Sequence, residues 1–78
     1  MADVRVRYWA GAQRAAGTSE ESLSAESVGE LRKQLAVRPE LSKVVAVASF
    51  LVDETPASDA TALTDGAVID VLPPFAGG

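Results

Sequence analysis

The chain has 78 residues, a length that allows one small domain with a modest hydrophobic core. Hydrophobic residues make up 47% of it and charged residues 23%, which is typical of a folded globular domain rather than of a disordered segment. The formal charge is −4 and there is no basic run, which argues against nucleic acid and anionic membranes as partners. We expect an acidic protein that meets a more basic partner protein.

The chain contains no cysteine and no histidine. Disulfides, thiolate nucleophiles, imidazole bases and the usual zinc ligands are therefore excluded together, and we do not expect a free-standing enzyme. No apolar run approaches the roughly 20 residues that cross a bilayer, and the first residues lack the features of an export signal. We expect a cytoplasmic protein with no membrane contact and no bound metal.

The first elements follow from local patterns. Residues 4–9 begin by alternating valine with arginine, a period of two that predicts a strand with one buried face. The helix formers of residues 10–16 predict a short helix or helical loop that ends at Gly17. Residues 19–25, in which Leu23 is the one clear apolar anchor, predict a second strand that pairs with the first as a hairpin.

The clearest local signal is Ser27-Val28-Gly29-Glu30, which has the spacing of a capping box. A serine hydroxyl and a glutamate side chain at this spacing satisfy reciprocal backbone donors, so a helix should begin at Ser27. Val28, Leu31 and Leu35 follow at spacings of three and four and predict one buried stripe. Arg32 and its polar neighbours are expected to face solvent.

The middle of the chain is less regular. Pro39 ends the helix or opens the next one, and residues 39–48 fit either a helix or a strand. We favour a short helix there, because residues 49–53 predict a strand that follows immediately. That strand is ended by residues 54–56, and residues 57–64 lack periodicity and are interpreted as a loop.

A last strand, residues 67–72, follows the Asp65-Gly66 turn. Alternation places Val68 and Leu72 on the face opposite the core, and Leu51 of the preceding strand on the same face. These side chains predict an apolar, partner-binding patch beside the end of the chain. The alternative is that a loop or helix covers them.

The order of hairpin, helix, strand and strand predicts an α+β fold, a small mixed sheet packed on one main helix. We expect a single domain over residues 1–78, with a flexible C-terminal tail at residues 73–78. Arg5 and Arg7 are interpreted as a solvated strand face, with contacts at the rim of an interface as the alternative.

The tail is the most informative segment. Two prolines, Pro73-Pro74, stiffen the exit from the sheet, and the side chains then shrink from Phe75 through Ala76 to Gly77 and Gly78. Such a thin end suits a narrow channel in a partner, whereas the alternative is a frayed glycine-rich terminus. We interpret Phe75 as an interface anchor, because no helix or strand is predicted to bury it.

The whole chain resembles the MoaD/ThiS family of ubiquitin-like sulfur carriers. The resemblance rests on VRVRYWA at residues 4–10, SVGEL at residues 27–31, LTDG at residues 63–66 and above all LPPFAGG at residues 72–78. It implies a ubiquitin-like β-grasp fold. Within the family, the ending is most similar to that of the MoaD branch, the small subunits of molybdopterin synthase.

The resemblance also implies a chemistry. Gly78 would carry an acyl-adenylate and then a thiocarboxylate, with Pro74, Phe75, Ala76 and Gly77 in contact with the partner. A ubiquitin-activating-type adenylyltransferase would use ATP and Mg²⁺, a sulfur donor protein would supply sulfur, and the large catalytic subunit of molybdopterin synthase would receive the tail in a heterotetramer. No cofactor is expected on the chain itself.

Three other functions stay open at this point. A sulfur carrier for thiamine or cysteine biosynthesis would use the same tail with other acceptors. A ubiquitin-like modifier would join the activated Gly78 to a lysine of a target protein. A pure interaction domain would involve no covalent chemistry at all.

Overall fold

The computed structural model describes residues 1–74. Its elements, in chain order, are β1 (Ala2–Tyr8), α1 (Gly11–Ala16), β2 (Glu20–Ala25), α2 (Val28–Ala36), α3 (Ser42–Val47), β3 (Ser49–Val52), β4 (Thr55–Ala57) and β5 (Val68–Leu72). The five strands form one sheet in the order β2-β1-β5-β3-β4. No helix in this part of the chain is long and apolar enough to cross a membrane.

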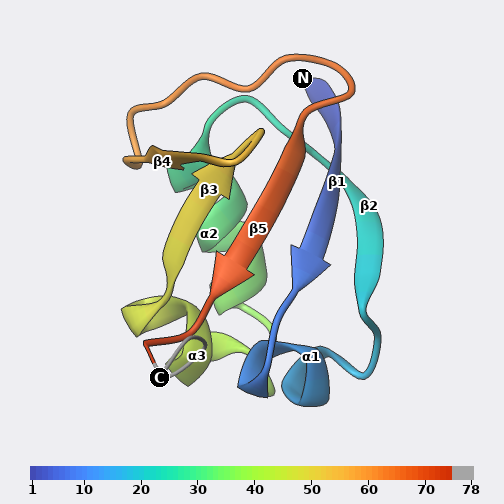
Figure 1. Cartoon of the computed structure of the whole chain (residues 1–78), viewed down its shortest axis with the longest axis vertical. Coiled ribbons are helices and arrows are strands. Elements are labelled where there is room, and N and C mark those ends of the chain that lie inside the picture. The colour runs from blue at the N-terminus through green and yellow to red at the C-terminus, as the bar shows by residue number, and fades with distance from the viewer. Residues whose placement is uncertain (75–78) are drawn as a thin grey trace.

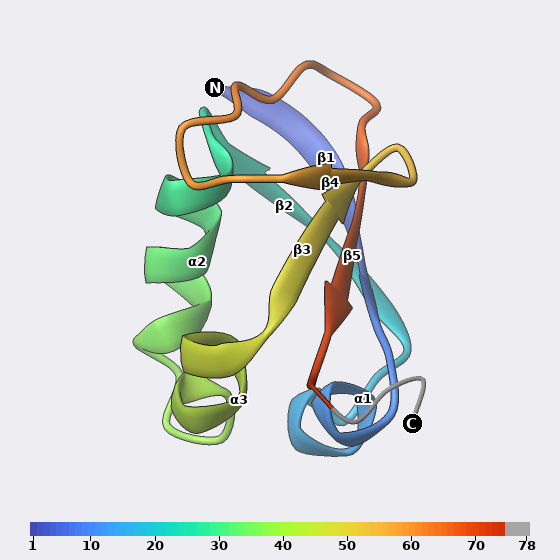
Figure 2. The same ribbon diagram turned by 60° about the vertical axis from the view of Figure 1, so that its left-hand side comes forward.

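The sheet is mixed and is covered on one face. β1 runs antiparallel to β2 and parallel to β5, and β3 runs antiparallel to both β5 and β4. Helix α2 lies across one face of the sheet, whereas α1 and α3 lie at the end towards which β5 runs (Figure 1, Figure 2). The expected α+β arrangement, one main helix on a small mixed sheet, is confirmed.

The core lies between α2 and the sheet. The predicted helical stripe is confirmed, because Val28, Leu31 and Leu35 have no exposed surface. They pack with alternate residues of the two central strands. These strand residues are Val4, Val6 and Tyr8 of β1 and Ile69 and Val71 of β5, all of them buried.

The start of α2 confirms half of the predicted capping box. The Ser27 hydroxyl accepts a hydrogen bond from the Glu30 backbone N–H at 3.1 Å. The Glu30 carboxylate accepts from the backbone N–H of Glu26, at 3.2 Å, and so caps one residue before the expected position. The predicted end of α1 is also confirmed, since Gly17 has a φ of 77°, in the left-handed region that favours glycine.

Two of the sequence predictions about single residues were wrong. Arg32 does not simply face solvent: its guanidinium lies 4.4 Å from the centroid of the Phe50 ring, and it donates to the Asp59 carboxylate and to the Val45 carbonyl. Trp9 does not continue the first strand, because β1 ends at Tyr8. A positive φ of 49° at Ala10 then turns the chain into α1.

One strand was missed. Thr55–Ala57 forms β4, which pairs with β3 through a two-residue turn at Asp53 and Glu54. Both turn residues have positive φ, 48° and 69°. Aspartate is common at the first position of such a turn, whereas glutamate here takes the second position, where glycine is usual. Pro56 is compatible with this position because β4 is an edge strand, where a backbone donor is dispensable.

Candidate functional site

The central strand β5 leads directly to the predicted functional tail. β5 ends at Leu72, after which Pro73 is half-buried and Pro74, the last described residue, is exposed. Figure 1 shows this end of the sheet opposite the N-terminus. The remaining predicted site residues lie outside the described part of the chain: Phe75, Ala76, Gly77 and Gly78.

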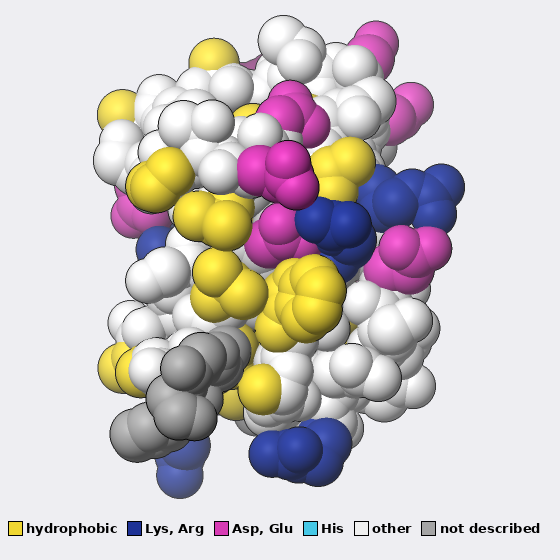
Figure 3. Space-filling view, in the orientation of Figure 1, with side chains coloured by type: hydrophobic (Ala, Val, Ile, Leu, Met, Phe, Trp, Pro, Cys, Tyr) yellow, Lys and Arg dark blue, Asp and Glu magenta, His cyan; other side chains and the backbone are white. Residues whose placement is uncertain are grey.

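The face of the sheet away from α2 is open beside this end. Val68 and Leu72 lie on it from β5, and Leu51 lies on it from β3, all three half-buried. In Figure 3, which views this face, hydrophobic side chains gather across its middle. The structure therefore brings together the three apolar residues that alternation selected, and their contact with a partner stays a prediction.

A buried carboxylate lies at the centre of the same face. Asp70 is 4% exposed and is hydrogen-bonded by two neighbouring side chains. Arg7 donates to it from Nε at 2.6 Å and from Nη2 at 2.9 Å, and the Trp9 indole N–H donates at 3.0 Å. The Arg7 hydrogen bonds lower the pKa of Asp70 against the opposing effect of burial, and the Trp9 N–H lowers it further. Asp70 is therefore held as an anion.

Trp9 is fixed in place by this cluster and is still 44% exposed. Its ring lies 5.7 Å from the Arg7 guanidinium carbon, and its backbone N–H donates to the Val71 carbonyl at 3.3 Å. Reasoning from the sequence missed this residue. The signal that identifies the cluster is the parallel pairing of Arg7 with Asp70, which only the sheet register reveals.

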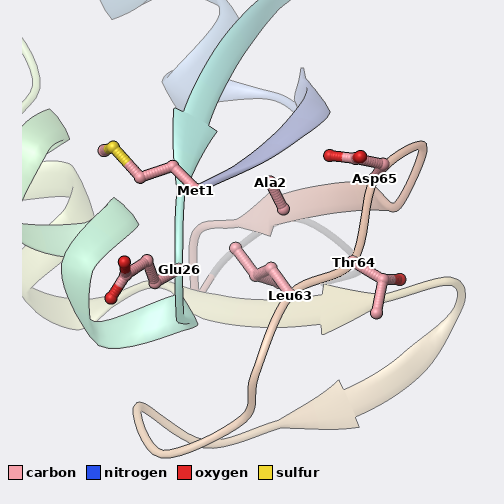
Figure 4. Close-up of a pocket in the computed structure, with 6 residues that line it drawn as sticks. All are labelled: Met1, Ala2, Glu26, Leu63, Thr64 and Asp65. Carbon is pink, nitrogen blue, oxygen red and sulfur yellow. The ribbon is translucent and has the colours of Figure 1, made fainter.

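Other hollows lie elsewhere on the described part of the molecule. One of about 360 Å³ lies near the N-terminus, at the end of the molecule away from Leu72. Figure 4 shows its two carboxylates, Glu26 and Asp65, on opposite sides, and Asp65 accepts the Asp3 backbone N–H at 2.9 Å. Within residues 1–74, no group of three potential metal ligands occurs.

The comparison with protein families decides what kind of protein this is. A model described as the ThiS family matches residues 6–78, nearly the whole chain. The chain belongs to the ThiS family. This family consists of ubiquitin-like sulfur carriers, which are small carrier proteins, and the expected membership of the MoaD/ThiS family is confirmed. No curated protein matched this ThiS-family chain.

Solved structures confirm the ubiquitin-like β-grasp fold of this ThiS-family protein. A putative molybdopterin converting factor subunit 1 from Pyrococcus furiosus is 26% identical, with a TM-score of 0.83, and the match covers 96% of this chain and 100% of that one. A chain from the complex of subunits 1 and 2 of molybdopterin-converting factor from Helicobacter pylori 26695 is 27% identical, with a TM-score of 0.77 and coverages of 97% and 99%. The small archaeal modifier protein 1 from Methanosarcina acetivorans is 28% identical, with a TM-score of 0.82 and coverages of 100% and 98%.

Proposed function

We propose that this chain is the sulfur-carrier subunit of a molybdopterin synthase, acting in the cytoplasm. The observation that carries the proposal is the family match, which extends through Gly78 and so includes the whole tail. Similarity to a putative molybdopterin converting factor subunit 1 supports the choice of pathway. The complex of subunits 1 and 2 from Helicobacter pylori supports a large catalytic subunit as partner.

The proposed chemistry takes place on the Gly78 carboxylate. With a reference pKa of about 3.5, a terminal carboxylate is an anion at neutral pH and a poor electrophile. A ubiquitin-activating-type adenylyltransferase, using ATP and Mg²⁺, joins a carboxylate oxygen to the α-phosphorus and releases pyrophosphate. The terminal sulfur of a persulfide donor then attacks the acyl carbon and displaces AMP, which gives an acyl disulfide. A thiol attacks the donor's sulfur and is oxidised to a disulfide with it, and this S–S cleavage leaves a thiocarboxylate at Gly78. The large subunit uses this sulfur to build the dithiolene of molybdopterin.

In this mechanism the carrier positions the reacting carbon of Gly78, and its partners carry out the catalysis. Ala76, Gly77 and Gly78 form the thin part of the tail that enters the partner, and Phe75 is the proposed anchor beside it. The tail follows a strand that is paired with β1 as far as Val71 and with β3 as far as Leu72. The reacting carbon is then held at a fixed distance from the docked domain. This distance matters because an active site tolerates little misplacement of a reacting atom.

The proposal is tested by supplying the chain with an activating enzyme, ATP, Mg²⁺ and a sulfur donor. We expect one oxygen to be replaced by sulfur, which fragmentation in a mass spectrometer locates at Gly78. The product should convert the pterin precursor when it is combined with the large synthase subunit. Deletion of Gly78, or one alanine added after it, should abolish transfer at an unchanged melting temperature. Full activity of the extended chain, with the alanine still attached, would contradict the proposal.

A second candidate function is supported by one comparison. The similarity to small archaeal modifier protein 1 favours a protein modifier, in which the activated Gly78 is joined to a lysine. Both readings share adenylation, so the product separates them: a thiocarboxylate supports the carrier and an isopeptide supports the modifier. A thiocarboxylate that supports only thiamine or cysteine synthesis would retain the carrier function and exclude the molybdopterin pathway.

A further inference from the structure

Strand β2 forms one margin of the sheet, and every second residue of it turns its backbone groups away from the sheet (Figure 1). The Tyr8 N–H donates to the Ser19 carbonyl at 2.8 Å, so Ser19 faces β1. Inward and outward residues alternate in an antiparallel pair. The register of β1 with β2 therefore points the N–H and C=O groups of Glu20, Ser22 and Ser24 outward. An edge of this kind is a template on which another strand can pair.

Two side chains are bonded to the outward carbonyls of this edge. Gln34, on α2, donates from Nε2 to the Ser24 carbonyl at 2.7 Å. The Thr18 hydroxyl donates to the Glu20 carbonyl at 3.0 Å. Within residues 1–74, no side chain or loop bonds to the outward groups of Ser22. Only the middle of the β2 edge is thus open.

The opposite margin of the sheet, β4, is closed in a different way. The residues that flank its two-residue turn, Val52 and Thr55, face each other, so the next residue, Pro56, turns its backbone outward. Proline has no N–H to offer to another strand. The N–H of Ser58, which follows β4, already donates to the Thr61 hydroxyl at 3.1 Å. Added strands therefore find no free donor at these positions.

The β2 edge is complementary to itself. In an antiparallel pair of two copies centred on Ser22, each Ser22 lies opposite its counterpart, Glu20 lies opposite Ser24, and Glu21 lies opposite Leu23. No like charges are then directly opposite each other, so the side chains of β2 do not prevent this pairing. The backbone bonds between Glu20 and Ser24 would need the two carbonyls that already accept side-chain donors. Only the bonds between the two Ser22 residues would remain.

We propose that the outer edge of β2 is a blocked self-association surface. A second copy of this chain fits it as an antiparallel strand centred on Ser22, and the side chains of Thr18 and Gln34 keep the two copies apart by occupying the flanking acceptors. The inference is independent of the proposed function, because β1 separates β2 from the strand that leads to the tail. It identifies two polar residues whose role is to keep the chain monomeric.

Sedimentation equilibrium of the full chain tests the proposal. Thr18→Val keeps the shape of the side chain and removes its donor, and Gln34→Ala removes the other donor with a residue that favours the helix. We expect the wild type to be monomeric and the double variant to dimerise, with an association constant at least about tenfold higher, because the freed acceptors add hydrogen bonds between the copies. Gln13→Ala, which removes the glutamine of α1, is the matched control and should behave as the wild type.

Ser22→Pro, added to the double variant, locates the interface. It removes the outward N–H at the centre of the edge without removing a bond to β1, so the dimer should dissociate. Hydrogen exchange of the Ser22 amide in the double variant should slow as the protein concentration rises. A folded double variant that stays monomeric would overturn the proposal, as would a dimer that Ser22→Pro leaves intact or that Gln13→Ala also forms. If the double variant does not fold, Gln34→Ala alone provides the same test.

Discussion

Asp70 is a buried carboxylate at the centre of the open sheet face, where its neighbours on both strands are mostly apolar. A buried carboxylate is costly unless its oxygens are hydrogen-bonded. Here three donors from Arg7 and Trp9 satisfy it, and hydrogen bonds to charged groups are stronger than neutral ones. One carboxylate therefore fixes both the guanidinium and the indole at the centre of the open face.

The pH dependence of stability should report this carboxylate. The pKa of Asp70 is lowered in the folded state, so its ionised form stabilises the fold above the unfolded value of about 3.9, and this contribution is lost as pH falls through the folded pKa. We expect Asp70→Asn to be less stable at pH 7 by about 1–3 kcal/mol and to lose less stability on acidification. Urea unfolding at several pH values measures both effects, and parallel pH profiles for the two proteins would contradict the assignment.

At this scale the sequence predicted the apolar residues of the face but not its polar centre. Leu51, Val68 and Leu72 follow from alternation alone, a local property of each strand. The pairing of Arg7 with Asp70 joins strands more than 60 residues apart, and no local pattern sets that register. Trp9 was misassigned to the strand because the turn after it depends on Ala10, an alanine with positive φ that composition does not reveal.

Among the elements, the hairpin of β3 and β4 combines a strained turn with an exposed charge. A two-residue turn with positive φ at both positions favours asparagine or aspartate followed by glycine, and here Glu54 takes the glycine position after Asp53. A non-glycine residue in the left-handed region costs roughly 1–2 kcal/mol. Asp53 is supported by its hydrogen bond to Val68, which leaves Glu54 as the residue whose strain has no compensating contact within the described chain.

Replacing Glu54 by glycine should therefore stabilise the protein. The free energy gained by relieving the positive φ is larger than the free energy lost to the greater conformational entropy of the unfolded glycine variant. We therefore expect the free energy of unfolding to rise by about 0.5–1 kcal/mol. For a domain of this size that corresponds to a rise in melting temperature of roughly 2–8 °C. Glu54→Gln is the matched control, since it removes the charge and keeps the strain. Equal melting temperatures for the two variants would show that the turn is not strained.

The elements themselves were largely predictable because their signals are local. The α2 helix has a capping serine and a stripe at spacings of three and four, and Gly17 ends α1 where a left-handed residue was expected. β4 was missed for the converse reason. Its three residues are too few for a period, Pro56 argues against a strand, and its pairing depends on a turn with an uncommon sequence.

At the scale of the whole molecule, the sheet is most stable at its centre and least stable at its edges. β5 is paired on both sides and its neighbour β1 is also internal, whereas β2 and β4 each have one free edge. The α2 helix packs on the central strands through side chains with no exposed surface. Local opening should therefore begin at the edges.

Hydrogen exchange tests this gradient. We expect the backbone amides of Ile69 and Val71, on the central strand β5, to exchange only through global unfolding. The amide of Ala57, on β4, should exchange faster through local opening. Exchange rates measured by NMR at several low urea concentrations separate the two routes, since global opening depends strongly on denaturant and local opening does not. Equal denaturant dependence for β4 and β5 would indicate one cooperative unit.

The position of β5 also determines how the molecule responds to mechanical force. A pull on the tail is directed along β5, which is bonded to β1 on one side and to β3 on the other. Such a load shears both ladders at once, so their hydrogen bonds share the force instead of breaking one after another as in an unzipped hairpin. On the proposed function, a partner that pulled on the tail would load both ladders together.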